Sequence, residues 1–196
     1  PETQENCPQD CQASSAAIPT PTGLTIKLNV KLPGIGLNTQ LGQNNKPKRV
    51  DRTINVKIFD ASNQEVPIPG GGKTVKFGAD GQYTGTIDLG DIPPGPYVVK
   101  VRMDNALWKL IPGIQNITKE PTSAPQTELI SGDVNQDNEI NLVDYNLLIS
   151  FMRLATVSCQ GANCPQKEAA DLNDDGKVDE VDLNILYSGL AKRKGD

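Results

Sequence analysis

Residues 24–32 alternate between apolar and polar side chains, and the apolar set is Leu24, Ile26, Leu28, Val30 and Leu32. Because successive side chains of a strand point to opposite faces, this pattern predicts a β-strand with one buried face. Similar runs cover residues 50–58, 73–77, 82–89 and 97–103, separated by turns rich in Pro and Gly. Short strands with such punctuation predict an antiparallel β-sandwich, with Trp108 and Leu110 in a further strand or at the edge of its core.

The hydrophobic period changes in the last third of the chain. Two stretches there have the apolar spacing of amphipathic helices: Val143, Leu147, Leu148, Phe151 and Met152 in the first, and Val181, Ile185, Leu186 and Leu190 in the second. Each stretch follows a segment dense in Asp and Asn, which we name acidic loop 1 (residues 133–144) and acidic loop 2 (residues 171–182). The expected fold class is therefore mainly β, a sandwich followed by a small α module built from a repeated loop-helix unit.

Both acidic loops carry oxygen-bearing residues at alternate positions. An EF-hand-type calcium loop takes ligands from positions 1, 3, 5, 7, 9 and 12, and position 7 uses only its backbone carbonyl. The predicted ligands are Asp133, Asn135, Asp137, Glu139, Asn141 and Asp144 in acidic loop 1, and Asp171, Asn173, Asp175, Lys177, Asp179 and Asp182 in acidic loop 2. Lys177 is compatible with this role because it lends a carbonyl. The sequence thus predicts two bound Ca²⁺ ions.

Two other loop positions fit the same interpretation. Position 6 requires a sharp turn with positive φ, and it holds Asn138 in acidic loop 1 and Gly176 in acidic loop 2. Position 8 is apolar in both loops, with Ile140 and Val178. We expect short strand-like segments around these apolar residues to stack the two loops against each other.

A calcium loop with one exiting helix, repeated within residues 131–190 and ending in Asp at position 12, resembles the dockerin module of cellulosomal and related extracellular proteins. The resemblance implies a module that docks on a cohesin domain of a scaffold. Dockerins often carry a Ser-Thr pair at loop positions 10 and 11, whereas this chain has Leu142-Val143 and Glu180-Val181. The partner surface is therefore predicted at Leu142, Val143, Glu180 and Val181, and the partner stays open between a cohesin-like domain and a neighbouring copy of the chain.

Charge and composition exclude several classes of function. The chain has a formal net charge of -5 and no histidine, which removes Ser-His and Cys-His nucleophile activation. No basic stripe points to a nucleic-acid partner. Acidic residues are scattered singly in the predicted sandwich, so no paired carboxylates suggest an enzyme. No apolar run is long enough for a membrane span.

Four cysteines form two close pairs, Cys7 with Cys11 and Cys159 with Cys164. An even number at local spacing favours disulfides in an oxidising compartment over a four-thiolate zinc site. Three connectivities are possible, and we favour local pairing, with the second bridge holding residues 158–166 compact. Together with the calcium loops and the start of the chain at Pro1 rather than Met, this predicts a secreted or cell-surface protein.

The expected organisation has four parts: an extended polar N-terminal segment (1–22), the sandwich (23–118), a linker (119–130) and the calcium module (131–196). Residues 79–83 and 91–101 are similar to the strand-turn-strand of prealbumin-like or Cna-B-type repeats of bacterial surface proteins, which implies a spacer. Some such repeats contain a Lys-Asn isopeptide bond, and the sequence assigns none here. Asn116 begins a glycosylation sequon that we expect to be unused unless the source glycosylates.

These features lead first to a non-catalytic, extracellular, calcium-binding structural protein that forms a fibre or surface assembly through head-to-tail contacts. The alternative is a cellulosome-like component whose dockerin binds a cohesin on a scaffold. The least favoured interpretation is a carbohydrate-binding protein or a hydrolytic enzyme.

Overall fold

A computed structural model describes residues 23–38, 43–70, 72–153 and 164–196. The predicted N-terminal segment and three of the cysteines, Cys7, Cys11 and Cys159, lie outside the described residues, so the disulfide predictions stay predictions. Within the described residues, no helix is both long enough and apolar enough to cross a membrane.

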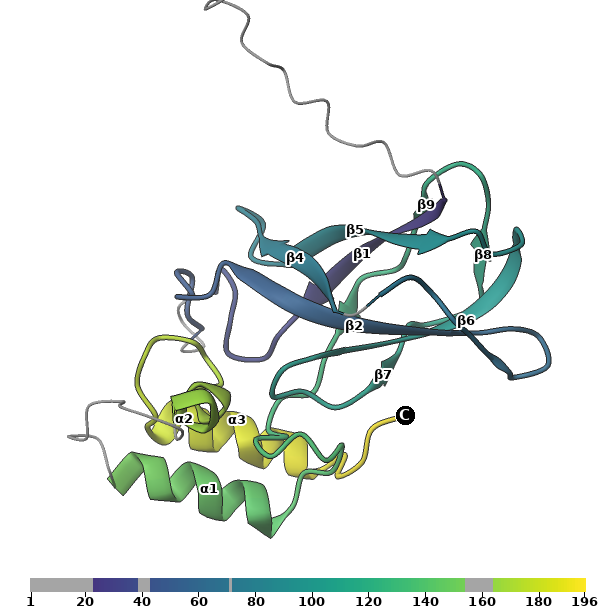
Figure 1. Ribbon diagram of the computed structural model, residues 1–196. Helices are drawn as coiled ribbons and strands as arrows, with labels where there is room; N and C mark the ends of the chain where they lie inside the picture. The colour runs from purple at the N-terminus through teal and green to yellow at the C-terminus, as the bar shows by residue number, and fades with distance from the viewer. Residues whose placement is uncertain (1–22, 39–42, 71, 154–163) are drawn as a thin grey trace, which may run out of the picture.

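The strands of the first part of the chain follow the predicted runs closely. They are β1 (Leu24–Lys31), β2 (Asp51–Phe59), β3 (Glu65–Val66), β4 (Lys73–Phe77), β5 (Tyr83–Gly90), β6 (Gly95–Met103), β7 (Lys109–Leu110), β8 (Gln115–Ile117), β9 (Thr122–Ser123) and β10 (Thr127–Glu128). The hydrogen-bonded order β10-β1-β5-β4-β2-β6-β7 bends into two layers, with β1, β4 and β5 in one and β2, β6 and β7 in the other (Figure 1). The fold class is confirmed as mainly β with a small helical module at the C-terminal end.

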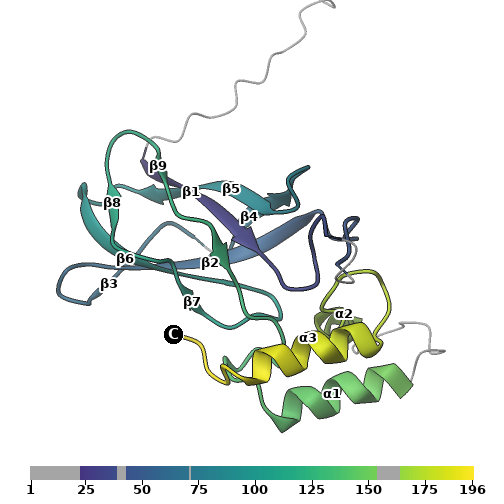
Figure 2. The same ribbon diagram turned by 180° about the vertical axis from the view of Figure 1, so that it is seen from behind.

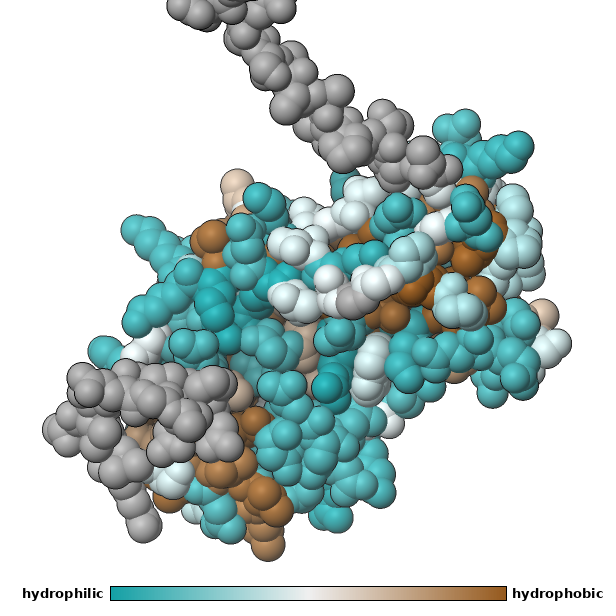
Figure 3. All heavy atoms as spheres, in the orientation of Figure 1, coloured by the Kyte–Doolittle hydropathy of each residue, from teal (hydrophilic) through white to brown (hydrophobic). Residues whose placement is uncertain are grey.

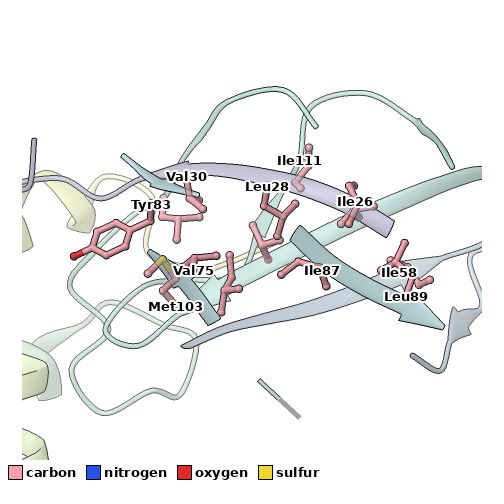
Figure 4. Packing of buried hydrophobic residues seen from close by; sticks show 14 of the residues in the cluster. Ile26, Leu28, Val30, Ile58, Val75, Tyr83, Ile87, Leu89, Met103 and Ile111 are labelled. Atoms are coloured by element: carbon pink, nitrogen blue, oxygen red, sulfur yellow. The ribbon is translucent and has the colours of Figure 1, made fainter. Parts of the chain in front are cut away.

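Apolar side chains at alternate positions of the strands fill the space between these layers. Ile26 of β1 lies opposite Ile87 of β5 in the antiparallel register, and Val30 lies opposite Tyr83. All four side chains are buried and point into the interior, where they meet Val75, Met103 and Ile58 (Figure 4). The core therefore rests on the period-two pattern that the sequence shows.

The segment expected to link the sandwich to the calcium module, residues 119–130, is itself part of the sheet. Its strands β9 and β10 both pair with β1, in parallel. Leu129 is buried in the sandwich core. The predicted division into four parts is not settled by this arrangement and stays a prediction.

Three helices form the C-terminal part: α1 (Leu142–Arg153), α2 (Cys164–Ala170) and α3 (Glu180–Leu190). Helices α1 and α3 follow the two acidic loops as predicted, whereas α2, directly before acidic loop 2, has no periodic signal in the sequence. We call the helices and both acidic loops the helical module. Its helices lie below the sheet, with α3 between α1 and the strands (Figure 2).

The helical module has a core of its own, separate from the sandwich core. Leu148, Phe151, Leu172, Ile185 and Leu186 are buried in it together with the position-8 residues of both acidic loops. One member comes from the sheet side: Leu107, in the turn between β6 and β7, is fully buried in this cluster. The two parts of the chain are thus joined by an inserted side chain as well as by the segment 119–130.

Candidate metal centre

The first and last residues of each acidic loop bind the loop's own backbone. In acidic loop 1, Asp133 Oδ2 accepts a hydrogen bond from Asn138 N at 2.9 Å, and Asp144 Oδ1 accepts from Val134 N at 2.8 Å. The second oxygen of Asp144 accepts from Asn141 N at 2.9 Å. Both carboxylates are fully buried, so they fix the two ends of the loop around one centre.

Acidic loop 2 repeats this scheme position by position. Asp171 Oδ2 accepts from Gly176 N at 2.7 Å, and Asp182 accepts from Leu172 N at 2.7 Å and from Asp179 N at 2.9 Å. Asp179 and Asp182 also form a capping box at the start of α3, and Asp179 Oδ1 accepts from Val181 N. Two segments 38 positions apart therefore fold through the same set of side-chain contacts.

The intervening predicted ligands fold back in the same way. In acidic loop 1, Asn135 Oδ1 accepts from Asp137 N at 3.1 Å, and Asp137 Oδ1 accepts from Glu139 N at 2.8 Å. The equivalent contacts of acidic loop 2 join Asn173 to Asp175 N and Asp175 to Lys177 N. The side chains at positions 3 and 5 are thus turned towards the backbone of their own loop, whereas the Glu139 side chain at position 7 pairs with Lys194 outside it.

Burial changes the acidity of three of these carboxyls. Burial, assisted by the charge of Asp144, raises the pKa of Asp133 to about 6 against the opposing hydrogen bond from Asn138. Burial, assisted by Asp174 and Asp175, likewise raises the pKa of Asp171 to about 6. Asp182 also has a pKa of about 6, chiefly because of burial. A nearby cation would favour the charged form of all three groups.

One carboxylate oxygen of acidic loop 1 shows whether that loop fits a cation. Asp133 Oδ1 is buried and has no hydrogen-bond partner. A buried carboxylate oxygen without a donor is costly unless a cation satisfies it, so acidic loop 1 fits Ca²⁺ by this criterion. Within the described ranges no group of three acidic, cysteine or histidine side chains is placed to hold a metal. The predicted ligand sets include three carboxylates in acidic loop 1 and four in acidic loop 2, which the structure does not gather into such a group, so the assignment of the twelve ligands stays a prediction.

The turn prediction for position 6 is confirmed, because Asn138 has φ 70 and Gly176 has φ 92. The expected pairing of the two loops through their position-8 residues is not found among the described residues. Ile140 N donates to Arg193 O at 2.6 Å, and Glu139 forms an antiparallel bridge with Lys194. Acidic loop 1 therefore pairs with the C-terminal tail (residues 193–196), while Ile140 and Val178 meet only as members of the module core.

Two of the four predicted partner residues, Leu142 and Val181, line different grooves. Leu142 is 75% exposed and lines a groove of about 570 Å³ together with Ile140, Asn141, Tyr145, Tyr187, Leu190 and Arg193. Val143 beside it is 51% exposed. Val181 instead is half-buried and lines a groove of about 760 Å³ between α3 and the sheet side, while Glu180 is exposed. The first groove is the open face of the helical module, and the second faces the sandwich.

Reasoning from the sequence missed the residues that contact the acidic loops from outside. Position 4 of acidic loop 2, Asp174, is buried and forms ion pairs with Arg49 and Arg52. Arg102 of β6 lies 4.0 Å from Asp133 Oδ2. No local signal could have revealed these contacts, although the basic cluster around residues 46–52 marks one of their sources.

Comparison with known proteins identifies the helical module. The family model described as "Dockerin type I domain" matches residues 131–190. Those residues are a dockerin type I domain, a non-catalytic interaction module, and they make up about a third of the chain. No curated protein sequence matched.

Two solved structures are similar over most of the chain. One is the N-terminal interface mutant of a type II Cohesin-X-Dockerin complex from Acetivibrio cellulolyticus, with 19% identity, TM-score 0.47, and coverage of 85% of this chain and 95% of that chain. The other is the C-terminal interface mutant of the same kind of complex, with 19% identity, TM-score 0.47, and coverage of 89% and 97%.

Proposed function

We propose, from the dockerin type I domain at residues 131–190, that the chain is a calcium-dependent docking protein whose helical module binds a partner protein. The observation that carries the proposal is the set of side-chain to backbone hydrogen bonds that the two acidic loops share. In each loop the first and last carboxylates accept hydrogen bonds from the loop's own backbone and hold it in a tight turn. Such a loop suits a hard cation that takes oxygen ligands.

The calcium would be held by the twelve predicted residues, six in each loop, with Glu139 and Lys177 contributing backbone carbonyls. Calcium bound to both loops would offset the repulsion between the buried carboxylates and hold α1 and α3 in place. The role of calcium here is structural, because it fixes the surface that meets the partner.

The proposed docking surface is the groove on the open face of the helical module. Its centre is apolar, formed by Ile140, Leu142, Tyr145, Tyr187 and Leu190, and Arg193 lies at its side. Hydrophobic spheres gather over α1 on this side of the molecule (Figure 3). Exposed aromatic and aliphatic side chains around a groove are typical of interaction sites, since a partner gains free energy by covering them.

The partner we propose is a cohesin-like domain, in keeping with the dockerin type I match. The test is binding of the full chain to a panel of cohesin domains, measured by biolayer interferometry in calcium and in excess chelator. We expect one cohesin class to bind in calcium only, and Leu142→Asp to abolish binding. Ile114→Asp, which changes a 68% exposed side chain on the sheet side, is the matched control and should bind normally. Binding that survives chelation would contradict the proposal.

A second candidate is head-to-tail assembly of the chain into a fibre or surface lattice. The observation that favours it is the presence of exposed apolar side chains on both parts: Leu142 and Val143 on the helical module, and Ile114 on the sheet side. Two different surfaces that join one copy to the next make a heterologous contact, which propagates unless it closes a ring. Light scattering at high concentration in calcium tests this candidate, and a strictly monomeric chain would contradict it.

Both candidates place the protein outside the cell and give it no catalytic role. The support is the class of module, the four cysteines and the lack of histidine. Detection of the protein in the culture medium or at the cell surface of its source would test the location.

A further inference from the structure

The sheet side contacts both acidic loops at the same two positions, the fourth and the sixth. At position 4, Lys48 N donates to Asp174 O at 3.1 Å in acidic loop 2, and Arg102 Nη1 donates to Gln136 O at 3.3 Å in acidic loop 1. At position 6, Trp108 N donates to Asn138 Oδ1 at 2.8 Å, and the side chain of Lys48 lies against Gly176. Neither position supplies a predicted calcium ligand through its side chain.

Position 4 needs such support because its backbone is unfavourable. Gln136 has φ 63 and Asp174 has φ 57, a region that residues other than Gly, Asn and Asp rarely occupy. In acidic loop 2 the carbonyl of Asp174 has a second donor: Asn44 Nδ2 lies 2.9 Å from both Asp174 O and Asn173 O. External donors thus stabilise the turn that brings the ligand positions of each loop together.

The carboxylate of Asp174 anchors acidic loop 2 to the sandwich. Arg49 donates to it twice, from its backbone N at 2.7 Å and from Nε at 2.8 Å, and Arg52 of β2 lies 3.4 Å away. Both arginines also pair with Asp104, next to the end of β6. The Asp174 and Arg52 side chains are 3% and 1% exposed, so the pair at the centre of this network is shielded from water, whereas Arg49 and Asp104 at its edge are 25% and 33% exposed.

Acidic loop 1 is anchored by the turn between β6 and β7. The carbonyl of Asn105 accepts from Gly132 N at 2.8 Å and from Asp133 N at 3.2 Å, and Leu107 N donates to Ile130 O at 2.9 Å. The Leu107 side chain then enters the module core. The residue that opens acidic loop 1 is therefore positioned by a segment that belongs to the sheet.

We propose that the sandwich is part of the calcium-binding apparatus. Residues 44–52 position acidic loop 2, and residues 102–108 position acidic loop 1, so calcium binding and docking of the helical module on the sheet strengthen each other. The coupling is reciprocal by thermodynamic linkage. This inference rests on the proposed binding of calcium by the two loops.

The test uses neutral substitutions in the full chain. Removal of an arginine would increase the attraction of the loops for a cation and mask a loss of positioning. Asn44→Ala removes the side-chain amide that donates to Asn173 O and Asp174 O in acidic loop 2, without a change of charge. Leu107→Ala truncates the inserted side chain. Calcium affinity, measured by isothermal titration calorimetry, should weaken about 5- to 150-fold at the affected loop, the usual range of coupling between sites.

Each variant has a matched control. Asn116→Ala removes an exposed amide from β8, and Ile111→Ala truncates a side chain buried in the sandwich core rather than in the module core. Both controls should bind calcium as the unchanged chain does. Ile111→Ala will lower the stability of the sheet, so it separates general destabilisation from loss of loop positioning.

Hydrogen exchange supplies a second readout that does not depend on affinity. Addition of calcium should slow amide exchange at residues 44–52 and 102–108 as well as in the loops. If the unchanged chain binds calcium, but Asn44→Ala and Leu107→Ala bind it equally well and exchange at residues 44–52 does not respond, the sandwich is a passive neighbour and the inference is wrong. If the unchanged chain binds no calcium, the proposed function and this inference both fail.

Discussion

Tyr145 of α1 and Tyr187 of α3 stack with their ring centroids 6.3 Å apart and their planes 22° apart. The pair joins the two helices that follow the acidic loops, and both rings line the proposed docking groove. The position of each helix is set by its own loop, since each loop ends in the helix that it precedes. The stack therefore forms only when both loops hold their helices in the positions seen here.

A double-mutant cycle on Tyr145→Ala and Tyr187→Ala should show that the two rings stabilise the helical module together. Offset aromatic pairs contribute about 0.5–1.5 kcal/mol beyond their buried area, and half-exposed rings such as Tyr187 belong at the lower end. Urea unfolding in calcium measures the coupling. Strict additivity of the two single changes would mean that the stack contributes nothing.

Loss of a loop's first carboxylate should weaken calcium binding more in acidic loop 2 than in acidic loop 1. Acidic loop 2 has four carboxylates at predicted ligand side-chain positions, including Asp179, and Gly176 accommodates its turn; acidic loop 1 has three. Calorimetry on Asp171→Ala and Asp133→Ala compares the two losses. A greater loss from Asp133→Ala would reverse the order of affinity.

Chelation at neutral pH should unfold the helical module while the sandwich persists. The module core is small and its loops bring buried carboxylates together, whereas the sandwich has a continuous apolar interior. Far-ultraviolet circular dichroism of the full chain should lose its helical contribution in excess chelator. An unchanged spectrum would contradict the role of calcium in folding.

Without calcium, stability should fall as pH rises from about 4 to about 6. The pKa values of Asp133, Asp171 and Asp182 are raised to about 6, so over this interval the folded chain binds more protons than the unfolded chain does, and deprotonation favours unfolding. Thermal melts in chelator at several pH values measure this slope.

Calcium should invert that pH dependence. The ion requires deprotonated carboxylates, so the stabilisation that it provides should decline as pH drops below about 6. Asp182→Asn, which cannot titrate, serves as the control and should flatten the slope in chelator. A slope of the opposite sign in chelator would show that other groups dominate.

Asp174→Ala should cost far more stability than the loss of a surface ion pair. It would leave the buried Arg52 without one of its two partners and Arg49 N without its acceptor, and disruption of buried pairs typically costs about 3–5 kcal/mol. The matched control is Glu65→Gln, which breaks a pair with Lys57 that is 42% and 51% exposed and should cost below about 1 kcal/mol. Chemical denaturation in calcium compares the two.

The parts of the fold that sequence predicts are those with local patterns. Alternation predicts β1 because every second residue from Ile26 to Leu32 is buried, and the position-6 turn needs only Asn138 and Gly176 themselves. The helix α2 could not be predicted, since its seven residues have no apolar period. The contacts of Asn44 and Arg49 with acidic loop 2 join residues 129 and 125 positions apart, and no local preference specifies such contacts.

The position-8 prediction failed for a different reason. Ile140 has the apolar character expected of a strand-like segment, but the strand edge of acidic loop 1 is taken by Arg193 and Lys194. A short strand pairs with whichever backbone is nearest, and side-chain type does not select among the candidates. The pairing partner of acidic loop 1 is determined by the path that the C-terminal tail takes past it.

The tail at residues 193–196 also joins the helical module mechanically to the sheet. After its pairing with acidic loop 1, Asp196 N donates to Trp108 O at 3.0 Å, and Asp196 Oδ2 accepts from Leu110 N of β7 at 2.7 Å. A chain anchored through its sheet and pulled by a docked partner would carry tension across the junction. The tail provides a further route for that tension beside the inserted Leu107 side chain and the ion pairs of Asp174. Separation of the helical module from the sheet then requires the tail contacts to break as well, which slows forced unfolding.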